Sequence, residues 1–371
     1  MPVKEGFDGA RIFVVRYAAV MYMEDLRKAR LGKLPALLLP WYDRCARPLP
    51  WRGERDPYRI WISETMLQQT RAETVKGYYA RFLRELPDVQ ALAEAEEERL
   101  LKLWEGLGYY SRVRNLQKAA RQICWERAGQ FPQTCEELRA LPGIGPYTAG
   151  AVASIAFEQP APAVDGNVVR LLSRYLCDEM PKEKLGEILR RELEEIYPPG
   201  RCGDFTQALM EAGATVCGPA GAPRCEDCPL KKDCLARENG RQKELPVSGK
   251  KTAHRTEART VFLLRAGDTL ALRKRPGKGL LAGMWEFPNV AGNLEASQAL
   301  EQAAWWGCGP WGEVAVRQEK HVFTHVTWEM TGYEIHCAQA PAEFVWATPA
   351  ELDSQYSLPT AFRRFLPKNE K

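Results

Sequence analysis

The sequence predicts two folds in one chain: an all-α part that fills the N-terminal two-thirds, and a C-terminal α+β domain. Three observations predict this. Apolar residues recur at helical spacing from about Leu34 to Tyr197, and few segments before residue 255 alternate as strands do. Four cysteines follow between Cys217 and Cys234. After a basic stretch, short apolar runs at 260–265 and 269–273 are typical of strands.

The helical part has recognisable start and stop signals. Asp56 followed by Pro57 predicts a helix start, because Asp accepts from free backbone N–H groups and Pro suits the first turn. The apolar series from Val75 to Leu86 keeps helical spacing until Pro87 ends it. Further helices are predicted around 89–104, 112–128, 134–140, 147–157, 166–177, 182–196 and 204–213. The C-terminal domain should add a helix at 293–305 and strands at 321–332 and 333–337.

The composition is that of a globular chain. Hydrophobic residues make up 45% of it, and no apolar run approaches the roughly 20 residues that span a bilayer. Residues 1–22 lack a proper signal peptide, since Arg16 interrupts the apolar stretch, and translation starting at Met23 is the alternative. We therefore expect no membrane contact and a cytoplasmic location. A monomer is expected, because no oligomerisation seam is evident.

Shifts in composition predict four segments. They are a loose N-terminal extension (1–33), a helical domain with a four-cysteine module (34–236, module 217–234), a basic linker (237–257) and the α+β domain (258–368). The net charge is only +4, yet nine Lys or Arg stand against four Asp or Glu from Lys231 to Arg259. Such a stretch is most often a solvated linker, and contact with phosphates is the alternative.

The strongest local signal is the spacing C-x7-C-x2-C-x5-C of Cys217, Cys225, Cys228 and Cys234. Thiols remain reduced in the cytoplasm, so metal ligation is favoured over disulfides. Histidine is absent from this segment, which leaves a [4Fe–4S] cluster or a zinc ion held by four cysteines.

A second signal is LPGIGPYTAG at 141–150, between two predicted helices. Gly143 and Gly145 allow a tight turn whose backbone amides can approach a phosphate at a helix N-terminus. This is the pattern of a helix-hairpin-helix, and an ordinary helix–helix turn is an equally good interpretation of the motif alone.

Two carboxylates form the third signal. Glu64 has apolar neighbours, so it lies either on a thin solvated stripe or in a pocket where burial raises its pKa toward neutral pH. Asp165 precedes a predicted helix that it would cap, and it is also suited to stabilise a developing cation. Tyr109, beside glycines in a predicted loop, and the amides of Gln68 and Gln69 are weaker candidates for entering a duplex.

Taken together and in order, these motifs resemble the helix-hairpin-helix DNA glycosylases, and within them the MutY-type adenine DNA glycosylases with their iron–sulfur cluster. The resemblance covers about 34–234 and rests on WISETMLQQT, GLGYYSRVRN, LPGIGPYTAGAV, AVDGNVVR and the four cysteines. It implies an enzyme of base excision repair that binds duplex DNA. The enzyme would flip out adenine paired with 8-oxoguanine or guanine and hydrolyse its N-glycosidic bond, leaving an abasic site.

The resemblance implies roles for individual residues. Glu64 would protonate adenine and Asp165 would stabilise the sugar cation, with Tyr147 and Asn167 positioning these groups. Where bifunctional relatives carry a lysine in the hairpin, this chain has Tyr147, which implies base removal without efficient strand cleavage. The adenine pocket would be lined by Arg47, Trp51, Arg52 and Leu67, and 8-oxoguanine would meet Gln69, Thr70, Leu107, Tyr109, Phe323, Thr324 and His325.

The C-terminal third is similar to the Nudix-like domain of the same family. Arg275-Pro276 and the run GLLAGMWEFP at 279–288 carry this similarity. The helix at 293–302 lacks the paired glutamates that a Nudix hydrolase needs for its metal, so we expect a recognition domain without pyrophosphatase activity. Two departures stand out: Thr324 replaces the serine of the family's Phe-Ser-His turn, and seven residues rather than six separate Cys217 from Cys225.

Three other functions fit parts of the pattern. A bifunctional glycosylase/lyase for oxidised pyrimidines lacks its lysine here, and a Nudix-type nucleotide hydrolase lacks its metal-binding helix. A non-catalytic DNA-binding scaffold would explain the hairpin, the basic stretch and the cysteines, but it leaves Glu64 and Asp165 without a role.

Overall fold

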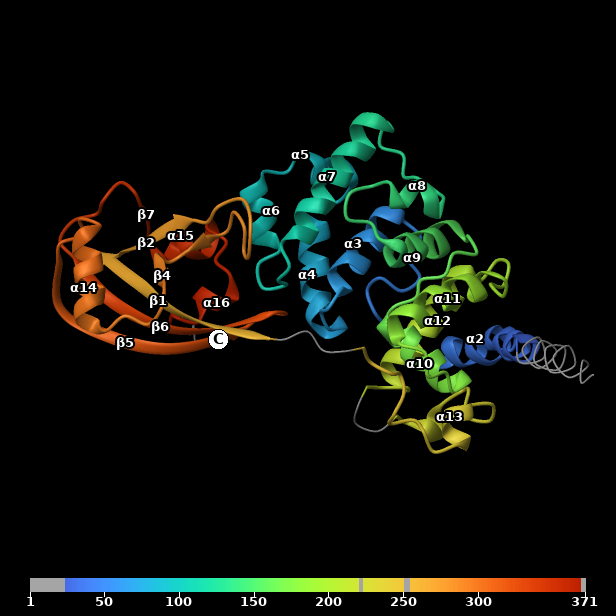
Figure 1. Ribbon diagram of the computed structural model, residues 1–371. Coiled ribbons are helices and arrows are strands. Elements are labelled where there is room, and N and C mark those ends of the chain that lie inside the picture. Colours follow the sequence, from blue (N-terminus) through green and yellow to red (C-terminus); the bar gives the residue numbers. More distant parts are fainter. Residues whose placement is uncertain (1–23, 220–222, 250–253, 368–371) are drawn as a thin grey trace, which may run out of the picture. The chain divides into compact units, whose positions relative to one another are not determined.

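The computed structural model describes residues 24–219, 223–249 and 254–367 (Figure 1). By its internal contacts the chain forms two compact units. The first unit contains residues 1–79 and 127–250, and the second contains residues 80–126 and 251–371. The predicted domain boundaries differ from this division, because the helices between residues 80 and 126 are grouped with the C-terminal residues.

The first unit is helical in its described part. Its elements are α2 (Leu34–Cys45), α3 (Pro57–Leu67), the start of α4 (Ala72–Glu85), α8 (Cys135–Arg139), α9 (Pro146–Phe157), α10 (Gly166–Leu176), α11 (Lys182–Glu194), α12 (Cys202–Thr215), the 3-10 turn η1 (Cys225–Asp227) and α13 (Leu235–Glu238). Helix α12 packs against α2, α9 and α10, and α3 packs against α9. The buried side chains of Phe205, Leu209 and Ala212 place α12 within the core of this unit.

The predicted loose extension was too long. Residues 24–32 are helical, Leu31 is buried in the core, and Arg27 forms ion pairs with Asp178 and Glu192. The apolar contact and these two ion pairs order a segment that its sequence alone does not mark as structured. Residues 1–23, including the rest of the predicted extension, lie outside the described residues.

The second unit begins with the end of α4 and continues through α5 (Val89–Glu94), α6 (Glu97–Leu103) and α7 (Ser111–Glu126). One helix was predicted around 89–104, but the chain breaks at Ala95, whose backbone is extended. The break is stabilised from α7, because Gln117 Nε2 donates to the carbonyl of Ala95 at 2.6 Å. A side-chain amide therefore replaces the helical hydrogen bond that the break removes.

A mixed sheet forms the rest of the second unit. Its strands are β1 (Arg255–Ala266), β2 (Thr269–Lys274), β3 (Trp285–Glu286), β4 (Asn289–Ala291), β5 (Pro310–Val322), β6 (Val326–Cys337) and β7 (Val345–Ala347), with α14 (Ala296–Trp305), α15 (Pro349–Ser354) and α16 (Thr360–Arg363). The main order is β3-β2-β1-β6-β5, with β4 beside β1 and β7 beside β2. Strands β1 and β6 run parallel, and the other pairs are antiparallel.

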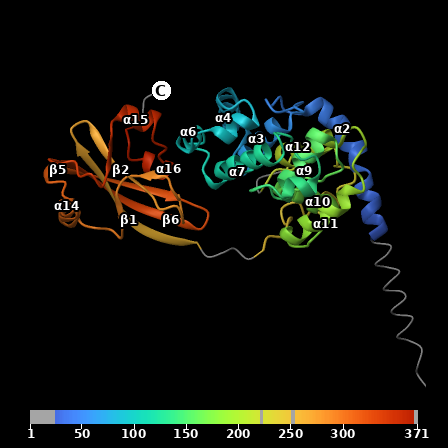
Figure 2. The same cartoon turned by 90° about the horizontal axis from the view of Figure 1, so that it is seen from above.

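Both faces of this sheet are covered. Helices α14 and α16 lie beside the sheet (Figure 2). Val261 and Leu263 of β1 lie in one core with Phe362 of α16, whereas Phe262 and Leu264 lie in a second core with Ala299 of α14. A strand buried on both faces explains the uninterrupted apolar run at 261–264. The strand predicted at 321–332 is divided by a turn at 323–325, where the NH of Phe323 donates to the carbonyl of Val326. These helices and the mixed sheet confirm the predicted all-α part and α+β domain.

Candidate active site

Glu64 is buried and does not lie on a solvated stripe. Asp56 caps α3 by accepting from the NH of Tyr58, and the helix is buried over most of its length. Glu64 is 5% exposed, and the hydroxyl of Tyr147, from the first turn of α9, donates to its Oε2 at 2.6 Å. The packing of α3 against α9 therefore brings together two groups that are separated by 83 residues.

Burial sets the protonation of this pair. It raises the pKa of Glu64, and the charge of Asp165 adds to the rise, while the Tyr147 hydrogen bond and Arg52 oppose it. Burial also raises the pKa of Tyr147 well above its ordinary value, so its hydroxyl stays protonated and can donate. A carboxyl group shifted in this direction is suited to general-acid chemistry near neutral pH.

Asp165 caps α10, as the sequence predicted. Its Oδ1 accepts from the NH groups of Asn167 (2.9 Å) and Val168 (2.8 Å), and its Oδ2 accepts from Nδ2 of Asn167 at 2.6 Å. Burial raises the pKa of Asp165, while these hydrogen bonds and Arg170 lower it. Helix α12 approaches this turn so closely that a Cβ on Gly213 would lie 2.6 Å from the carbonyl oxygen of Asn167.

Arg170 fixes Asn167 from the other side. Its Nη2 donates to Oδ1 of Asn167 and to the carbonyl of Gly213, each at 2.8 Å, and its Nε donates to the carbonyl of Cys217 at 2.8 Å. The turn that presents Asp165 is thus held by side-chain hydrogen bonds as well as by the helix cap. Sequence reasoning gave Arg170 no role, because its partners are residues whose proximity only the fold reveals.

A buried acid on α12 organises the predicted adenine-side arginines, and the sequence did not reveal it. The side chain of Glu211 is 1% exposed and accepts from Nε of Arg47 at 2.6 Å and from Nη2 of Arg52 at 2.7 Å. Burial opposes ionisation, but both arginines favour it, and the pKa of Glu211 is lowered overall. Nη1 of Arg52 also donates to Oε1 of Gln207 at 2.6 Å and to the hydroxyl of Tyr42 at 2.9 Å. Three side chains therefore fix the position of its guanidinium group.

The other predicted adenine-side residues differ in their surroundings. Trp51 is 5% exposed and meets the ring of Tyr79 edge-on at 5.5 Å. Leu67 ends α3, and the backbone of Gln69 beyond it has a φ of 60°. Nε2 of Gln68 donates to Oγ1 of Thr148 in α9 at 3.2 Å, which links the segment after α3 to the helix that follows the hairpin.

The predicted hairpin is present between α8 and α9, which pack together. Gly143 adopts a φ of 77°, and Gly145 forms the N-cap of α9 without a side-chain cap. A residue with a Cβ is strained at that φ, so the turn requires glycine at Gly143. The first turn of α9 also carries Tyr147, and the hairpin thereby sets the position of the hydroxyl that reaches Glu64.

The predicted opposite-base residues of the second unit come from two segments. Leu107 is buried, whereas Tyr109 is 48% exposed and has a φ of 48°. The hydroxyl of Tyr109 lies 2.6 Å from Oγ1 of Thr324 in the turn between β5 and β6. Phe323 packs edge-on against His321 and Trp328, and the carbonyl of His325 accepts from the NH of Arg255 at 3.3 Å.

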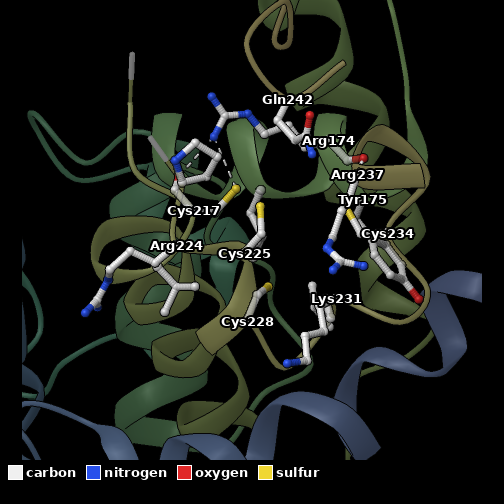
Figure 3. Close-up of a pocket in the computed structure, with 14 residues that line it drawn as sticks. Arg174, Tyr175, Cys217, Arg224, Cys225, Cys228, Lys231, Cys234, Arg237 and Gln242 are labelled. Carbon is white, nitrogen blue, oxygen red and sulfur yellow. Dashed lines mark hydrogen bonds between the residues drawn. The ribbon is translucent and has the colours of Figure 1, made fainter. Parts of the chain in front are cut away.

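The four cysteines line one cavity in the first unit (Figure 3). Cys217 follows α12, Cys225 begins η1, Cys228 follows η1, and Cys234 is the N-cap residue of α13. Nη1 of Arg174, a buried side chain, lies 3.4 Å from Sγ of Cys217. Residues 220–222, within the loop with the additional residue, lie outside the described part.

The chemistry of this donor set fits a metal group with sulfur ligands. Burial raises the pKa of Cys228 to about 12, and the three neighbouring thiols add to the rise, so the cavity disfavours four free thiolates. A bound cation would reverse this preference by stabilising the deprotonated sulfurs. Within the described residues, no three His, Cys, Asp or Glu side chains are already gathered around a single point as metal ligands.

Comparison with curated proteins identifies the family. The adenine DNA glycosylase of Mus musculus is 36% identical over 367 residues, which cover 82% of this chain and 71% of the mouse protein. That of Schizosaccharomyces pombe is 32% identical over 394 residues and covers 85% of each chain. The chain belongs to the adenine DNA glycosylase family. This confirms the resemblance that the motifs carried.

Domain comparisons agree with membership of the adenine DNA glycosylases. The model of the HhH-GPD superfamily of base excision DNA repair proteins matches residues 62–199, and a NUDIX domain model matches residues 260–368. A solved thermostable thymine-DNA glycosylase aligns with a TM-score of 0.51 and 29% identity, over 58% of this chain and 99% of that one. These matches confirm the predicted helix-hairpin-helix and Nudix-like folds. Among the described helices, none combines the length and apolar character that a membrane span requires.

Proposed function

We propose that this adenine DNA glycosylase removes adenine mispaired with 8-oxoguanine or guanine in duplex DNA, leaving an abasic site. The observation that carries the proposal is the buried hydrogen bond from Tyr147 to Glu64. The charge of Asp165 acts on both groups, because it raises the pKa of Glu64 and of Tyr147. Two carboxyl groups whose pKa values are raised by burial, one held by a hydroxyl and one by a helix cap, suit the cleavage of a glycosidic bond.

Glu64 acts first in the proposed mechanism. In its protonated form it donates a proton to N7 of the flipped adenine, which makes the base a better leaving group. The bond between C1′ and N9 then breaks, its electron pair leaves with adenine, and positive charge develops on the sugar. Tyr147 holds the Glu64 carboxyl in position through its 2.6 Å hydrogen bond.

Asp165 acts on the sugar in this proposal. Its carboxylate faces the developing oxocarbenium ion and stabilises it electrostatically, as the second carboxylate of a glycosidase does. Asn167 keeps the carboxyl group oriented through its backbone and side-chain amides. Water then adds to C1′ and loses a proton, giving the abasic site. Tyr147 offers no amine for a Schiff base, so the enzyme is monofunctional and strands stay intact.

The remaining predicted residues would hold the two bases and the backbone. Arg47 and Arg52, fixed by Glu211, would meet the polar edge of adenine, with Trp51 and Leu67 supplying apolar surface. Gly143 and Gly145 would bring hairpin amides close to a phosphate. The opposite base would meet Gln69, Thr70, Leu107, Tyr109, Phe323, Thr324 and His325, with the Tyr109 ring inserted into the stack.

We also propose that Cys217, Cys225, Cys228 and Cys234 hold a [4Fe–4S] cluster. The group would cross-link the segments around η1 and order Arg224, Lys231 and their neighbours as a basic surface for duplex DNA. Four cysteines line this cavity, which fits either a cluster or a zinc ion held by four cysteines, and the resemblance to the iron–sulfur glycosylases favours the cluster.

Cys228→Ser should remove the bound metal. The wild-type protein is expected to be brown and to contain about four iron atoms per chain, whereas the variant loses both the colour and the iron. Its affinity for duplex DNA should fall, because the cluster no longer orders the basic segment around Arg224 and Lys231. Cys124→Ser, a change on α7, is the matched control and should keep the iron. Wild-type protein that contains one zinc and no iron would contradict the cluster.

The pH dependence of adenine release should report on Glu64. Because the protonated form is active, the rate falls as pH rises through the Glu64 pKa. The Tyr147 hydrogen bond lowers that pKa, so Tyr147→Phe should move the alkaline limb to higher pH while reducing the maximal rate. Single-turnover rates between pH 5 and pH 9 measure this. A limb that moves to lower pH would show that Tyr147 does not stabilise the ionised carboxylate.

Opposite-base discrimination tests the proposed substrate. Duplexes that differ only in the base opposite adenine (8-oxoguanine, guanine or thymine) should release adenine fastest opposite 8-oxoguanine and slowest opposite thymine. Equal rates on all three would show that the enzyme does not read the opposite base.

A further inference from the structure

Glu105 joins two segments of the second unit, and nothing in the proposed reaction uses it. It lies one residue beyond Trp104, the C-cap residue of α6, which ends at Leu103, and its side chain is 11% exposed. One oxygen accepts from the NH of Leu358 at 2.9 Å and from Nε of Arg363 at 2.5 Å, and the other accepts from Nη2 of Arg363 at 3.1 Å. This two-pronged pairing with a guanidinium and a backbone amide fixes the carboxylate in both distance and angle.

Lys102 strengthens the same connection. Its ammonium lies 2.8 Å from the second oxygen of Glu105 and donates to the carbonyls of Leu352 (2.9 Å) and Tyr356 (3.1 Å). The end of α6 is therefore tied to the segment from α15 to α16 by charge-assisted hydrogen bonds. We call Lys102, Glu105, Leu358 and Arg363 the α6 clamp.

A rigid path leads from the clamp to Tyr109. The loop 104–110 contains Gly106, Gly108 and Tyr109, all with positive φ. Side chains next to and within the loop fix two of its carbonyls. Nε1 of Trp104 donates to the carbonyl of Gly108 at 3.1 Å, and Nη2 of Arg112 donates to the carbonyl of Leu107 at 3.0 Å. Displacement of Glu105 would therefore be passed to Tyr109 and not absorbed within the loop.

A second path leads from the clamp to Thr324. Leu358 and Phe362 are fully buried in the sheet core that also contains Trp328. Trp328 meets Phe323 edge-on at 4.9 Å, and Phe323 precedes Thr324 in the turn. The two paths end on hydroxyls that lie 2.6 Å apart, those of Tyr109 and Thr324.

We propose that Glu105 is a positioning residue for opposite-base specificity. The α6 clamp keeps the hydroxyls of Tyr109 and Thr324 side by side, so that both contact the base opposite adenine. This inference rests on the proposed function, which assigns both hydroxyls to the opposite base. Glu105 touches no reacting atom. It keeps the loop 104–110 and the turn 323–325 at the separation at which 8-oxoguanine contacts both.

The test compares single-turnover adenine release opposite 8-oxoguanine and opposite guanine. Glu105→Gln should lower the ratio of these rates about tenfold, since charge-assisted hydrogen bonds are lost, while the rate opposite guanine stays within about twofold. Arg363→Gln should do the same, and the double variant should add little, because both changes open one clamp. Glu85→Gln, which breaks the ion pair between Glu85 at the end of α4 and Arg99 of α6, is the matched control.

Each outcome decides between support and rejection. An unchanged ratio in both single variants, with the wild type showing a preference, would overturn the clamp and leave the proposed function standing. Parallel losses on both duplexes would show a merely structural role and would also overturn it. If Glu105→Gln does not fold, Arg363→Gln gives the answer alone. A wild type without preference would reject the opposite-base assignment itself, and the clamp with it.

Discussion

Glu64→Gln is expected to abolish adenine release and to leave duplex binding intact. The amide keeps the size of the carboxyl group and can still accept from Tyr147, but it cannot donate a proton to N7. The loss of a buried general acid should slow the chemical step by about a thousandfold or more. Single-turnover rates, together with a binding titration on the same duplex, measure the two properties separately.

The stability of this variant provides a control for folding. Burial raises the pKa of Glu64 above its unfolded value, so ionisation of the carboxyl group destabilises the native state as pH rises beyond the unfolded pKa. Glu64→Gln removes that cost, and its thermal midpoint at neutral pH should equal or exceed that of the wild type. Glu73→Gln, at an exposed position on α4, should change neither rate nor midpoint. Near-normal turnover by Glu64→Gln would eliminate Glu64 as the acid.

Asp165→Asn is the second change with a large expected effect. Asparagine caps helices about as well as aspartate, so α10 should remain folded. The variant lacks the negative charge opposite the developing sugar cation, and adenine release should fall by about a hundredfold or more. The same substitution removes a charge that raises the pKa of Glu64, so the alkaline limb of the residual activity should move to lower pH.

A comparison with Asp165→Ala separates the charge from the cap. Alanine removes both, so it should lower the thermal midpoint as well as the rate, whereas asparagine should lower the rate with a smaller effect on stability. If Asp165→Asn releases adenine at a rate near that of the wild type, the electrostatic role is wrong and Asp165 is a helix cap alone.

Much of the fold could be predicted because its signals are local. Asp56 and Asp165 cap helices whose starts their own neighbours reveal, and the strand at 260–265 is marked by its continuous apolar run. The break at Ala95 was missed, because the amide that stabilises it comes from Gln117, on another helix. The helix at 24–32 was missed for the same reason, since its ion pairs are made with Asp178 and Glu192.

The residues of the candidate site also differ in whether their signals are local in the sequence. The apolar neighbours of Glu64 left its burial open and the family resemblance supplied its role, whereas the cysteines were predicted by their spacing. Glu211 and Arg170 were not, because their importance lies in long-range partners: Glu211 meets Arg47 and Arg52 across 164 and 159 residues. The sequence signal that could have found Glu211 is its place as the one charged residue in the small and apolar stretch 208–214 of α12.

The central claim is tested most directly by base release from a labelled duplex with adenine opposite 8-oxoguanine, analysed with and without hot alkali. We expect free adenine to be released and strand breaks to appear only after alkali, since an abasic site is stable until base cleaves it. Strand breaks without alkali would contradict a monofunctional glycosylase. The absence of breaks in both lanes, with duplex binding intact, would contradict the enzymatic function itself.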